Sequence, residues 1–281
     1  MLTMTKRNLQ LYFYNKASVF SSLLGALIAF VLYIVFLQKN MLDAWSSEVN
    51  AEIILDNWVI GGTLAVTSIT TTWTGVARLI RDKETHKLDD FLLTDTSRFR
   101  LYMGYLLSAS IIGFIMQMVM LLIMEIYFKW QDNLTFDFDK LPLIIVVMIL
   151  SSVMGAVLAL LVVQFVSSVE VNERLSIIIG TASGFLVGVY IPIGTLPDFA
   201  QTVVKVTPGA YVSASYRQIL LSEKISDWSL PHINVNEYLG IGLKWGKLTT
   251  LNQNILITSL ILGVGILFLG GVLLAQKFQK R

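Results

Sequence analysis

The most regular feature of this sequence is a series of long apolar runs separated by short polar segments. A helix rises about 1.5 Å per residue, so about 20 helical residues cross the ~30 Å hydrocarbon layer of a membrane. We therefore predict six transmembrane helices, at roughly 18–37, 58–77, 103–126, 141–166, 175–191 and 254–275.

The composition agrees with this pattern, because 55% of the residues are hydrophobic and only 14% are charged. Such a balance is typical of an integral membrane protein. The runs are continuously apolar and do not alternate, which argues against a β-barrel. The first run is followed by "QKNMLDAWSS" and not by a small-residue cleavage site, so we expect it to remain as a span. The prediction is one all-α transmembrane domain over residues 1–281, in the cell membrane.

The distribution of positive charge predicts the orientation. With the N-terminus inside, 13 of the 21 lysines and arginines fall in inner segments, and the short outer loops hold three. The other five lie in one long outer segment, where the positive-inside rule has little force. We therefore expect both termini to face the cytoplasm.

The segment before the first span, residues 1–17, mixes cations with large apolar side chains in "MTKRNLQLYFYNKASVF". A segment of this kind lies along the inner membrane surface, with aromatic rings at headgroup level and cations outward. The alternative is a simple basic flank that orients the first span.

The inner segment between the second and third spans, residues 78–100, is highly charged but keeps an apolar face. Leu88, Phe91 and Leu92 are spaced i, i+3, i+4, so a helix would place them on one side. "TDTS" then predicts a helix stop, with Thr96 or Ser97 capping the next helix. The alternative is an ordinary solvated loop.

The long outer segment, 192–253, begins with a break in the fifth apolar run. Three of the five prolines, Pro192, Pro197 and Pro208, fall within it close together, and proline removes a backbone donor. The stretch 199–206 between them is too short to cross a membrane. We predict a re-entrant or interfacial helical hairpin, whose freed backbone groups are buried in protein.

These segments together resemble the ABC-2 type permeases, the membrane subunits of ATP-binding-cassette transporters. "ETHKLDDFLLTDTSRFRLYMGY" resembles their first cytoplasmic loop, with His86 and Asp95 at positions where glycine and proline are usual. "IPIGTLPDFAQTVVKVTPGAYVSASYRQIL" is similar to their outer hairpin, and the N-terminal segment to their interfacial helix. The matching positions are Glu84, Leu88, Phe91 or Leu92 and Thr94 in the loop, and Pro208, Tyr211 and Arg217 in the hairpin.

The resemblance implies half of a transporter. A second permease copy or a paralogue would complete the pathway, and two copies of a cytoplasmic ATPase would bind the inner loops. The loop after the second span would be the coupling helix. Its candidate residues are Arg81, Asp82, Glu84, His86, Leu88, Asp89, Phe91 and Leu92. The apolar pathway favours export of a hydrophobic or amphiphilic substrate: a drug, a peptide or a lipid.

Catalytic chemistry has little support in the sequence. There is no cysteine, and His86 and His232 would lie on opposite sides of the membrane, so no metal site is expected. The nearest approach to a phosphate-binding loop, "GIGLKWGKLTT", fails at Ile241 and Leu248. We therefore expect ATP and Mg²⁺ to bind the partner ATPase and expect no nucleic-acid partner. Glu125 is the only ionisable side chain predicted inside a span. A membrane enzyme or assembly factor acting on lipids is the alternative.

Two stripes of small or hydroxyl side chains complete the candidates. Thr63, Thr67, Thr70 and Thr74 share one face of the second span, where they could line a solute path or bond to their own helix. Gly180, Gly184 and Gly188 are four residues apart in the fifth span. They would let another helix pack closely, within the subunit or between subunits.

Overall fold

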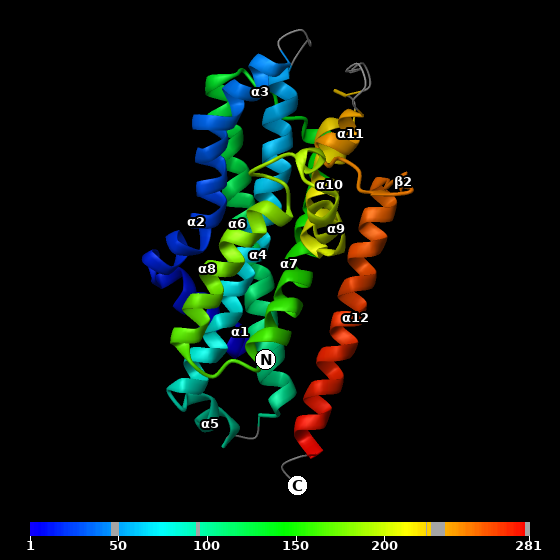
Figure 1. The fold of residues 1–281 in the computed structure, drawn as a ribbon. Helices are drawn as coiled ribbons and strands as arrows, with labels where there is room; N and C mark the ends of the chain where they lie inside the picture. The colour runs from blue at the N-terminus through cyan, green and yellow to red at the C-terminus, as the bar shows by residue number, and fades with distance from the viewer. Residues whose placement is uncertain (46–50, 94–95, 223, 226–233, 279–281) are drawn as a thin grey trace.

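A computed structural model describes residues 1–281 except 46–50, 94–95, 223, 226–233 and 279–281. Thr94, Asp95 and His232 therefore lie outside the described residues. The chain forms an elongated bundle of helices (Figure 1). The short helix α5 (Lys87–Leu92) lies at one end, and α3 (Gln38–Ala44) and α11 (Val235–Tyr238) lie at the other. We call these the α5 end and the α11 end.

Among the described residues, five helical units are long and apolar enough to cross a membrane. The first joins α2 (Lys16–Leu32), a π-helical turn (Tyr33–Leu37) and α3. The second is α4 (Ala51–Glu84), and the third is α6 (Arg98–Gln131). The fourth joins a 3₁₀ turn (Phe138–Lys140) to α7 (Leu141–Val163). The last is α12 (Leu251–Phe278). The two long helices α4 and α6 extend well beyond the predicted spans 58–77 and 103–126.

The fifth predicted span is the exception. The run 175–191 falls on α8, which covers Val169–Leu186 and so ends before the run does. Its first two turns carry Glu170, Glu173 and Arg174. Because three charges fall within 18 helical residues, α8 is not among the helices apolar enough to count as a span. The six-span count is therefore not confirmed.

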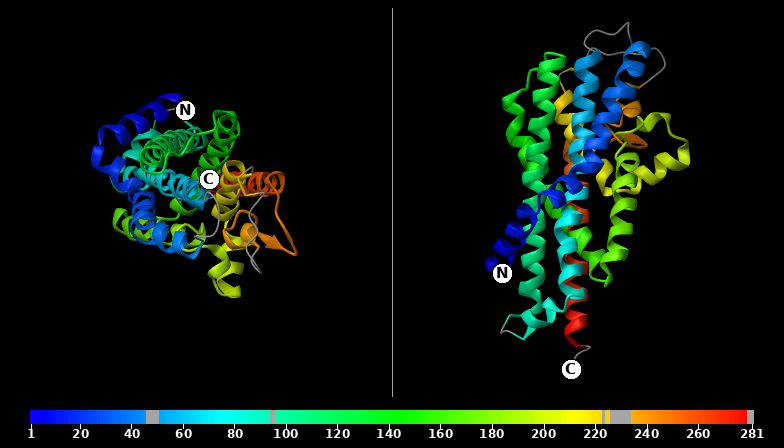
Figure 2. Two further views of the ribbon diagram at one scale, coloured as in Figure 1. Left: turned by 90° about the horizontal axis from the view of Figure 1, so that it is seen from above. Right: turned by 90° about the vertical axis from the view of Figure 1, so that its left-hand side faces the viewer.

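The centre of the bundle is α4, which packs against α2, α6, α7, α8 and α10 (Figure 2). Small residues allow this. A β-carbon at Gly75 would lie 2.9 Å from the α-carbon of Ala109, and one at Gly113 would lie 2.5 Å from the Thr72 methyl. Lipid is as apolar as the helices, so close packing of this kind holds membrane helices together. Most of α12, by contrast, is exposed.

The N-terminal segment forms α1 (Leu2–Tyr14), which diverges from the bundle axis and packs on α6 (Figure 2). Met4 fits against Gly104, where a β-carbon would come within 2.9 Å of it. The chain turns at Asn15, whose side chain accepts a hydrogen bond from the Ser18 amide and caps α2. A helix thus forms where one was predicted. Its position at the membrane surface stays a prediction.

The segment between α8 and α12 is a chain of short elements set by its prolines. Pro192 precedes a 3₁₀ turn (Ile193–Thr195), Pro197 precedes α9 (Asp198–Val206), and Pro208 opens α10 (Pro208–Leu221). Proline suits the first turn of a helix, where its missing donor is not needed. After α11, β1 (Lys244–Trp245) and β2 (Lys247–Leu248) form a two-residue antiparallel ladder. Short helices therefore form where the hairpin was predicted, and a re-entrant or interfacial hairpin stays a prediction.

Two side chains of α10, Tyr211 and Arg217, hold this segment in place. The Tyr211 hydroxyl donates to the Lys205 carbonyl at 2.8 Å and accepts from Trp245 Nε1 at 2.8 Å. Arg217 is fully buried and donates to the backbone carbonyls of Trp58, Gly188 and Gly240. Arg217 also stacks on the Trp58 ring, 4.9 Å from its centroid. Its role is therefore to fix α10 against α4.

Candidate functional site

The α5 end of the bundle is organised around Asp82, a fully buried residue near the end of α4. Arg7 of α1 donates to both carboxylate oxygens, at 2.8 and 3.0 Å. Arg78 lies 3.3 Å from one of them, and the Tyr105 hydroxyl of α6 donates at 2.7 Å. The hydrogen bond to Asp82 raises the pKa of Arg7 above its ordinary value, which keeps the guanidinium charged. One carboxylate thus ties three helices together.

The predicted coupling helix is α5, and its apolar face packs on its own chain. A left-handed turn at His86 (φ 58°) directs the chain back toward the bundle. Leu88 is buried, and Phe91 and Leu92 pack against a cluster of side chains that includes residues of α4, α6 and α7. Arg7 stacks on the Phe91 ring at 5.0 Å. The outward face consists of His86, Lys87, Asp89, Asp90 and Leu93.

Two neighbouring charged residues of α4, Lys83 and Glu84, hold the loop between α7 and α8 at the α5 end of the bundle. Lys83 Nζ donates to the Gln164 carbonyl at 2.7 Å and lies within 3.4 Å of the Val163 and Val166 carbonyls, where α7 ends. Glu84 Oε1 accepts from the amide of Val169, the first residue of α8. Both contacts satisfy backbone groups that a helix terminus leaves unpaired.

These contacts divide the predicted coupling residues into two groups. Asp82, Glu84, Leu88, Phe91 and Leu92 contact other elements of their own chain. Arg81, His86 and Asp89 are exposed, and His86 lies 3.3 Å from Asp89 of the same helical turn. Sequence reasoning missed Arg7, Arg78, Tyr105 and Lys83. Of these contacts, only the Arg78–Asp82 pair could be recognised in the sequence, because its i, i+4 spacing is typical of ion pairs on a helix.

Glu125 is the only ionisable residue in the predicted spans, but α4 is longer than its predicted span and buries two more. Asp82 and Asp56 are both fully buried in α4. Asp56 lies toward the α11 end and accepts hydrogen bonds from the Tyr33 hydroxyl at 2.9 Å and from Gln38 at 3.3 Å. Both aspartates fall close to the ends of a helix that is longer than the predicted span, so the shorter span concealed them.

A large apolar cleft of about 800 Å³ runs between α2, α4 and α8. Leu24, Ile28 and Leu32 form its α2 wall, and Ile177 and Ile179 belong to its α8 wall. Polar atoms are few and come mainly from hydroxyl side chains. They belong to Ser21, Ser22, Thr70, Thr74, Ser176 and Thr181, with Glu173 at the α5 end. A cavity of this size and character suits an amphiphilic molecule.

Of the four threonines in the α4 stripe, only Thr70 and Thr74 line this cleft. Thr67, Thr70 and Thr74 each donate a hydrogen bond to a carbonyl of their own helix. Thr63 and Thr67 are fully buried, and the Thr63 hydroxyl has no partner among the described residues. Thr70 and Thr74 line the cleft as well as bonding to α4. A continuous path along all four is not present.

The three glycines of the predicted stripe have separate environments. Gly180 lines the cleft, with open space where a β-carbon would be. Gly184 lies beneath the Tyr190 ring, too close for any side chain. Gly188 lies beyond α8 with φ of +69°, a conformation that favours glycine. One shared helix-packing face is therefore a wrong prediction, because α8 ends before Gly188.

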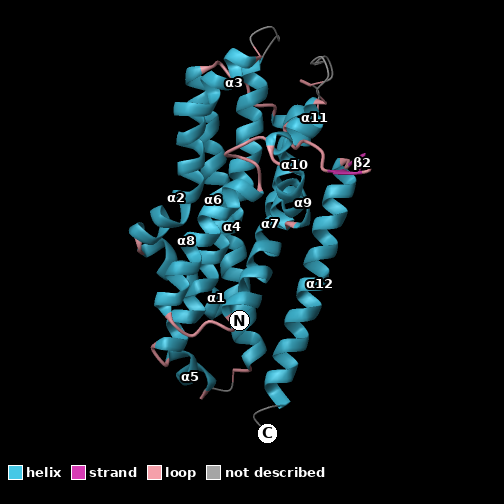
Figure 3. Ribbon diagram, in the orientation of Figure 1, coloured by secondary structure: helices cyan, strands magenta, loops and turns pink. Residues whose placement is uncertain are grey.

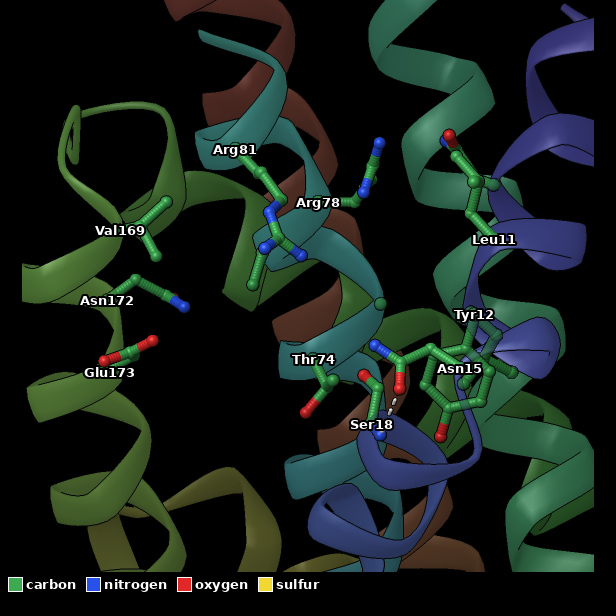
Figure 4. Close-up of a pocket in the computed structure, with 14 residues that line it drawn as sticks. Leu11, Tyr12, Asn15, Ser18, Thr74, Arg78, Arg81, Val169, Asn172 and Glu173 are labelled. Atoms are coloured by element: carbon green, nitrogen blue, oxygen red, sulfur yellow. Dashed lines mark hydrogen bonds between the residues drawn. The ribbon is translucent and has the colours of Figure 1, made fainter. Parts of the chain in front are cut away.

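A smaller cavity of about 240 Å³ lies next to the cleft, nearer the α5 end, and Figure 4 shows the residues that line it. Thr74 and Glu173 line both spaces. In contrast to the cleft, this cavity is polar: Arg78 and Arg81 come from α4 and Asn15 from the junction of α1 and α2. Together the two spaces form one site with a polar end and an apolar body.

An all-helical bundle with five membrane-length helices and an amphiphilic cleft is that of a multi-pass membrane protein. The family model described as "ABC-2 family transporter protein" matches residues 50–275, which is most of the chain. The chain therefore belongs to the ABC-2 transporter family. No curated protein matches it.

Membership of this family makes the chain a permease subunit of an ABC transporter. The family implies an ABC ATPase as its partner and a membrane location. It also favours a non-enzymatic membrane subunit over a membrane enzyme, because ATP hydrolysis in these transporters belongs to the ATPase.

Proposed function

We propose that this chain forms half of an export pathway for a hydrophobic or amphiphilic substrate, which enters through the cleft between α2, α4 and α8. Two copies, or one copy and a paralogue, complete the pathway, and two ATPase subunits bind at the α5 end. ATP and Mg²⁺ bind to those subunits. Both termini and the α5 end face the cytoplasm, and the substrate is a drug, a peptide or a lipid.

The observation that carries this proposal is the joined cleft and polar cavity. An apolar space of about 800 Å³ accepts hydrocarbon. The polar cavity at the α5 end accepts a charged or hydrogen-bonding group. A sugar or an ion would find almost no partners along the walls of Leu24, Ile28 and Ile177. An amphiphile satisfies both ends of the site.

Filling the cleft tests the pathway. Gly180→Leu adds a side chain to a position with open space, so we expect normal folding but at least a tenfold loss of export, on the order of 1.4 kcal/mol. The measurement is export of an amphiphilic dye from cells that co-express the cognate ATPase. Gly263→Leu is the matched control, because Gly263 also has open space and lies on the exposed face of α12.

Equal export by the two leucine variants would contradict the pathway. Loss of protein from the membrane in Gly180→Leu alone would instead make Gly180 a packing position, and the cleft would then have no role in transport.

The structure also changes which residues of α5 are candidates for contact with the ATPase. Leu88, Phe91 and Leu92 are committed to the chain's own core. We infer that the partner contacts the exposed face, which has Lys87, Asp89 and Asp90. The helix α5 itself lies near one end of the bundle (Figure 3).

A charge reversal on that face tests the contact. We expect Asp90→Lys to reduce the amount of ATPase that co-purifies with the permease by about fivefold, since a like charge opposite a partner costs on the order of 1 kcal/mol. Asp198→Lys is the control, because Asp198 is an exposed carboxylate of α9, outside the α5 end. If the two variants retain equal ATPase, the exposed face of α5 is not the coupling surface.

A further inference from the structure

The polar cavity at the α5 end has a lining whose composition suits one class of ligand. It lies where α1 meets α2, between α4 and α8 (Figure 4). Its volume is about 240 Å³, enough for a phosphate and a few further atoms, and it shares Thr74 and Glu173 with the lining of the apolar cleft. The ligand must therefore combine a small polar head with a hydrocarbon body.

The charged side chains in and next to the cavity have a net charge of +1. Arg7, Arg78 and Arg81 provide three cations, and Asp82 and Glu173 provide two carboxylates. Asp82 is shared by the first two arginines, whereas Arg81 has no carboxylate within ion-pair distance among the described residues. A ligand group with one negative charge neutralises the cluster.

The hydrogen-bonding atoms indicate what carries that charge. Arg78 Nε is buried without a partner among the described residues. The guanidinium of Arg81 extends into the space between α4 and α8, and the amide nitrogen of Asn15 points into the cavity, because its oxygen is bonded to the Ser18 amide (Figure 4). These donors belong to residues that line the cavity, and arginine forks match the geometry of phosphate oxygens.

The opposite wall, on α8, offers acceptors. Glu173 contributes its carboxylate to the cavity, and Asn172 has a buried side-chain oxygen without a partner among the described residues. Acceptors here would repel a bare dianion, but they suit a ligand that carries a donor next to its phosphate. An ammonium or a hydroxyl group satisfies them.

We propose that this cavity binds the phosphodiester headgroup of a phospholipid that carries its own donor, an ethanolamine or a glycerol group, with the acyl chains in the cleft. The phosphate faces Arg78, Arg81 and Asn15, and the headgroup donor faces Glu173. The lipid comes from the leaflet at the α5 end, which is the inner leaflet in the proposed orientation. Choline has neither N–H nor O–H, so phosphatidylcholine leaves Glu173 without a hydrogen bond. Lipid binding at this site does not depend on whether the lipid is transported.

The test is retention of lipid by the purified, delipidated chain, measured by native mass spectrometry. The probes are phosphatidylethanolamine, phosphatidylglycerol and phosphatidylcholine with identical acyl chains. We expect the first two to bind about fivefold more tightly than the third. Arg81→Gln should lower binding of the first two about tenfold, and Glu173→Gln should reduce the preference over phosphatidylcholine to about twofold, since a charged hydrogen bond is lost in each.

Arg174→Gln is the matched control. Arg174 is an exposed arginine of α8, the helix that also carries Glu173. It pairs with Glu170 and does not line the cavity. Its loss should leave all three lipids unchanged. Equal binding of the three lipids by the native chain, or native-like binding by Arg81→Gln, would overturn the proposal.

A competition arm separates a membrane lipid from a soluble ligand. Glycerophosphoethanolamine has the same head but no acyl chains, so we expect a hundredfold excess not to displace phosphatidylethanolamine. Displacement at equal concentration would overturn the lipid assignment, because the cleft would then contribute nothing. The ATPase takes no part in these measurements, so their failure is distinct from a failure of the transport proposal.

Discussion

Asp82→Asn is expected to destabilise the chain by about 2–3 kcal/mol and to release α1 from the bundle. The substitution keeps the volume but leaves the guanidinium groups of Arg7 and Arg78 close together without their counter-charge. Breaking a fully buried pair costs on the order of 3–5 kcal/mol. The loss here is smaller, because both arginine side chains are about one quarter exposed and water screens them.

Two measurements check this result: the thermal unfolding midpoint in detergent, and the rate of tryptic cleavage after Arg7. Asp90→Asn is the control, because Asp90 is exposed and lies on α5, at the same end of the bundle. We expect Arg7→Gln to cost less than Asp82→Asn, since Asp82 would keep Arg78 and Tyr105. An Asp82→Asn chain with native stability and native resistance to trypsin would show that the cluster does not hold α1.

This cluster gives the α5 end a mechanical role. Arg7 binds Asp82 with one edge and stacks on Phe91 of α5, so a displacement of α5 acts on α1 through one side chain. Lys83 and Glu84 connect the same turn of α4 to the α7–α8 loop. An ATPase that moves α5 would therefore act on α1, which borders the polar cavity, and on α8, which borders both the cavity and the cleft.

Much of this fold follows from hydrophobic patterning. Five of the six predicted spans correspond to helices of membrane length, and the prolines at 192, 197 and 208 mark the starts of short elements as expected. Helix length is different. Polar residues such as Asp56 and Asp82 lie toward the two ends of α4, and an apolar window stops before residues whose polar groups find partners in other helices.

The candidate site was less readable for a related reason. The spacing of Leu88, Phe91 and Leu92 predicts an apolar face, but spacing does not say what covers it. Here the cover is the chain's own bundle, positioned by the left-handed turn at His86. The cleft joins α2 to α8, which are distant in sequence, so no local pattern could reveal it.

The second large effect is expected where Arg217 of α10 contacts Trp58 of α4. Arg217→Leu should destabilise the chain by about 3–5 kcal/mol. Arg217 is fully buried, and its loss leaves the carbonyls of Trp58, Gly188 and Gly240 without these donors. Each carbonyl left unpaired in a dry site costs on the order of 1–3 kcal/mol. The stability of Arg217→Lys should fall between that of the native chain and that of Arg217→Leu, because one ammonium cannot reach three separated carbonyls.

The same contact is testable from its other side. Gly61 and Gly62 make room for Arg217, and a β-carbon at Gly62 would lie 2.8 Å from both Arg217 Nη2 and the Val189 side chain. Gly62→Ala should therefore lower the unfolding midpoint, whereas Gly263→Ala, in open space on α12, should not. In the double variant Gly62→Ala/Arg217→Leu the two losses should not add, because both remove one contact. Full additivity would mean that Gly62 serves another neighbour and that Arg217 does not fasten α10 to α4.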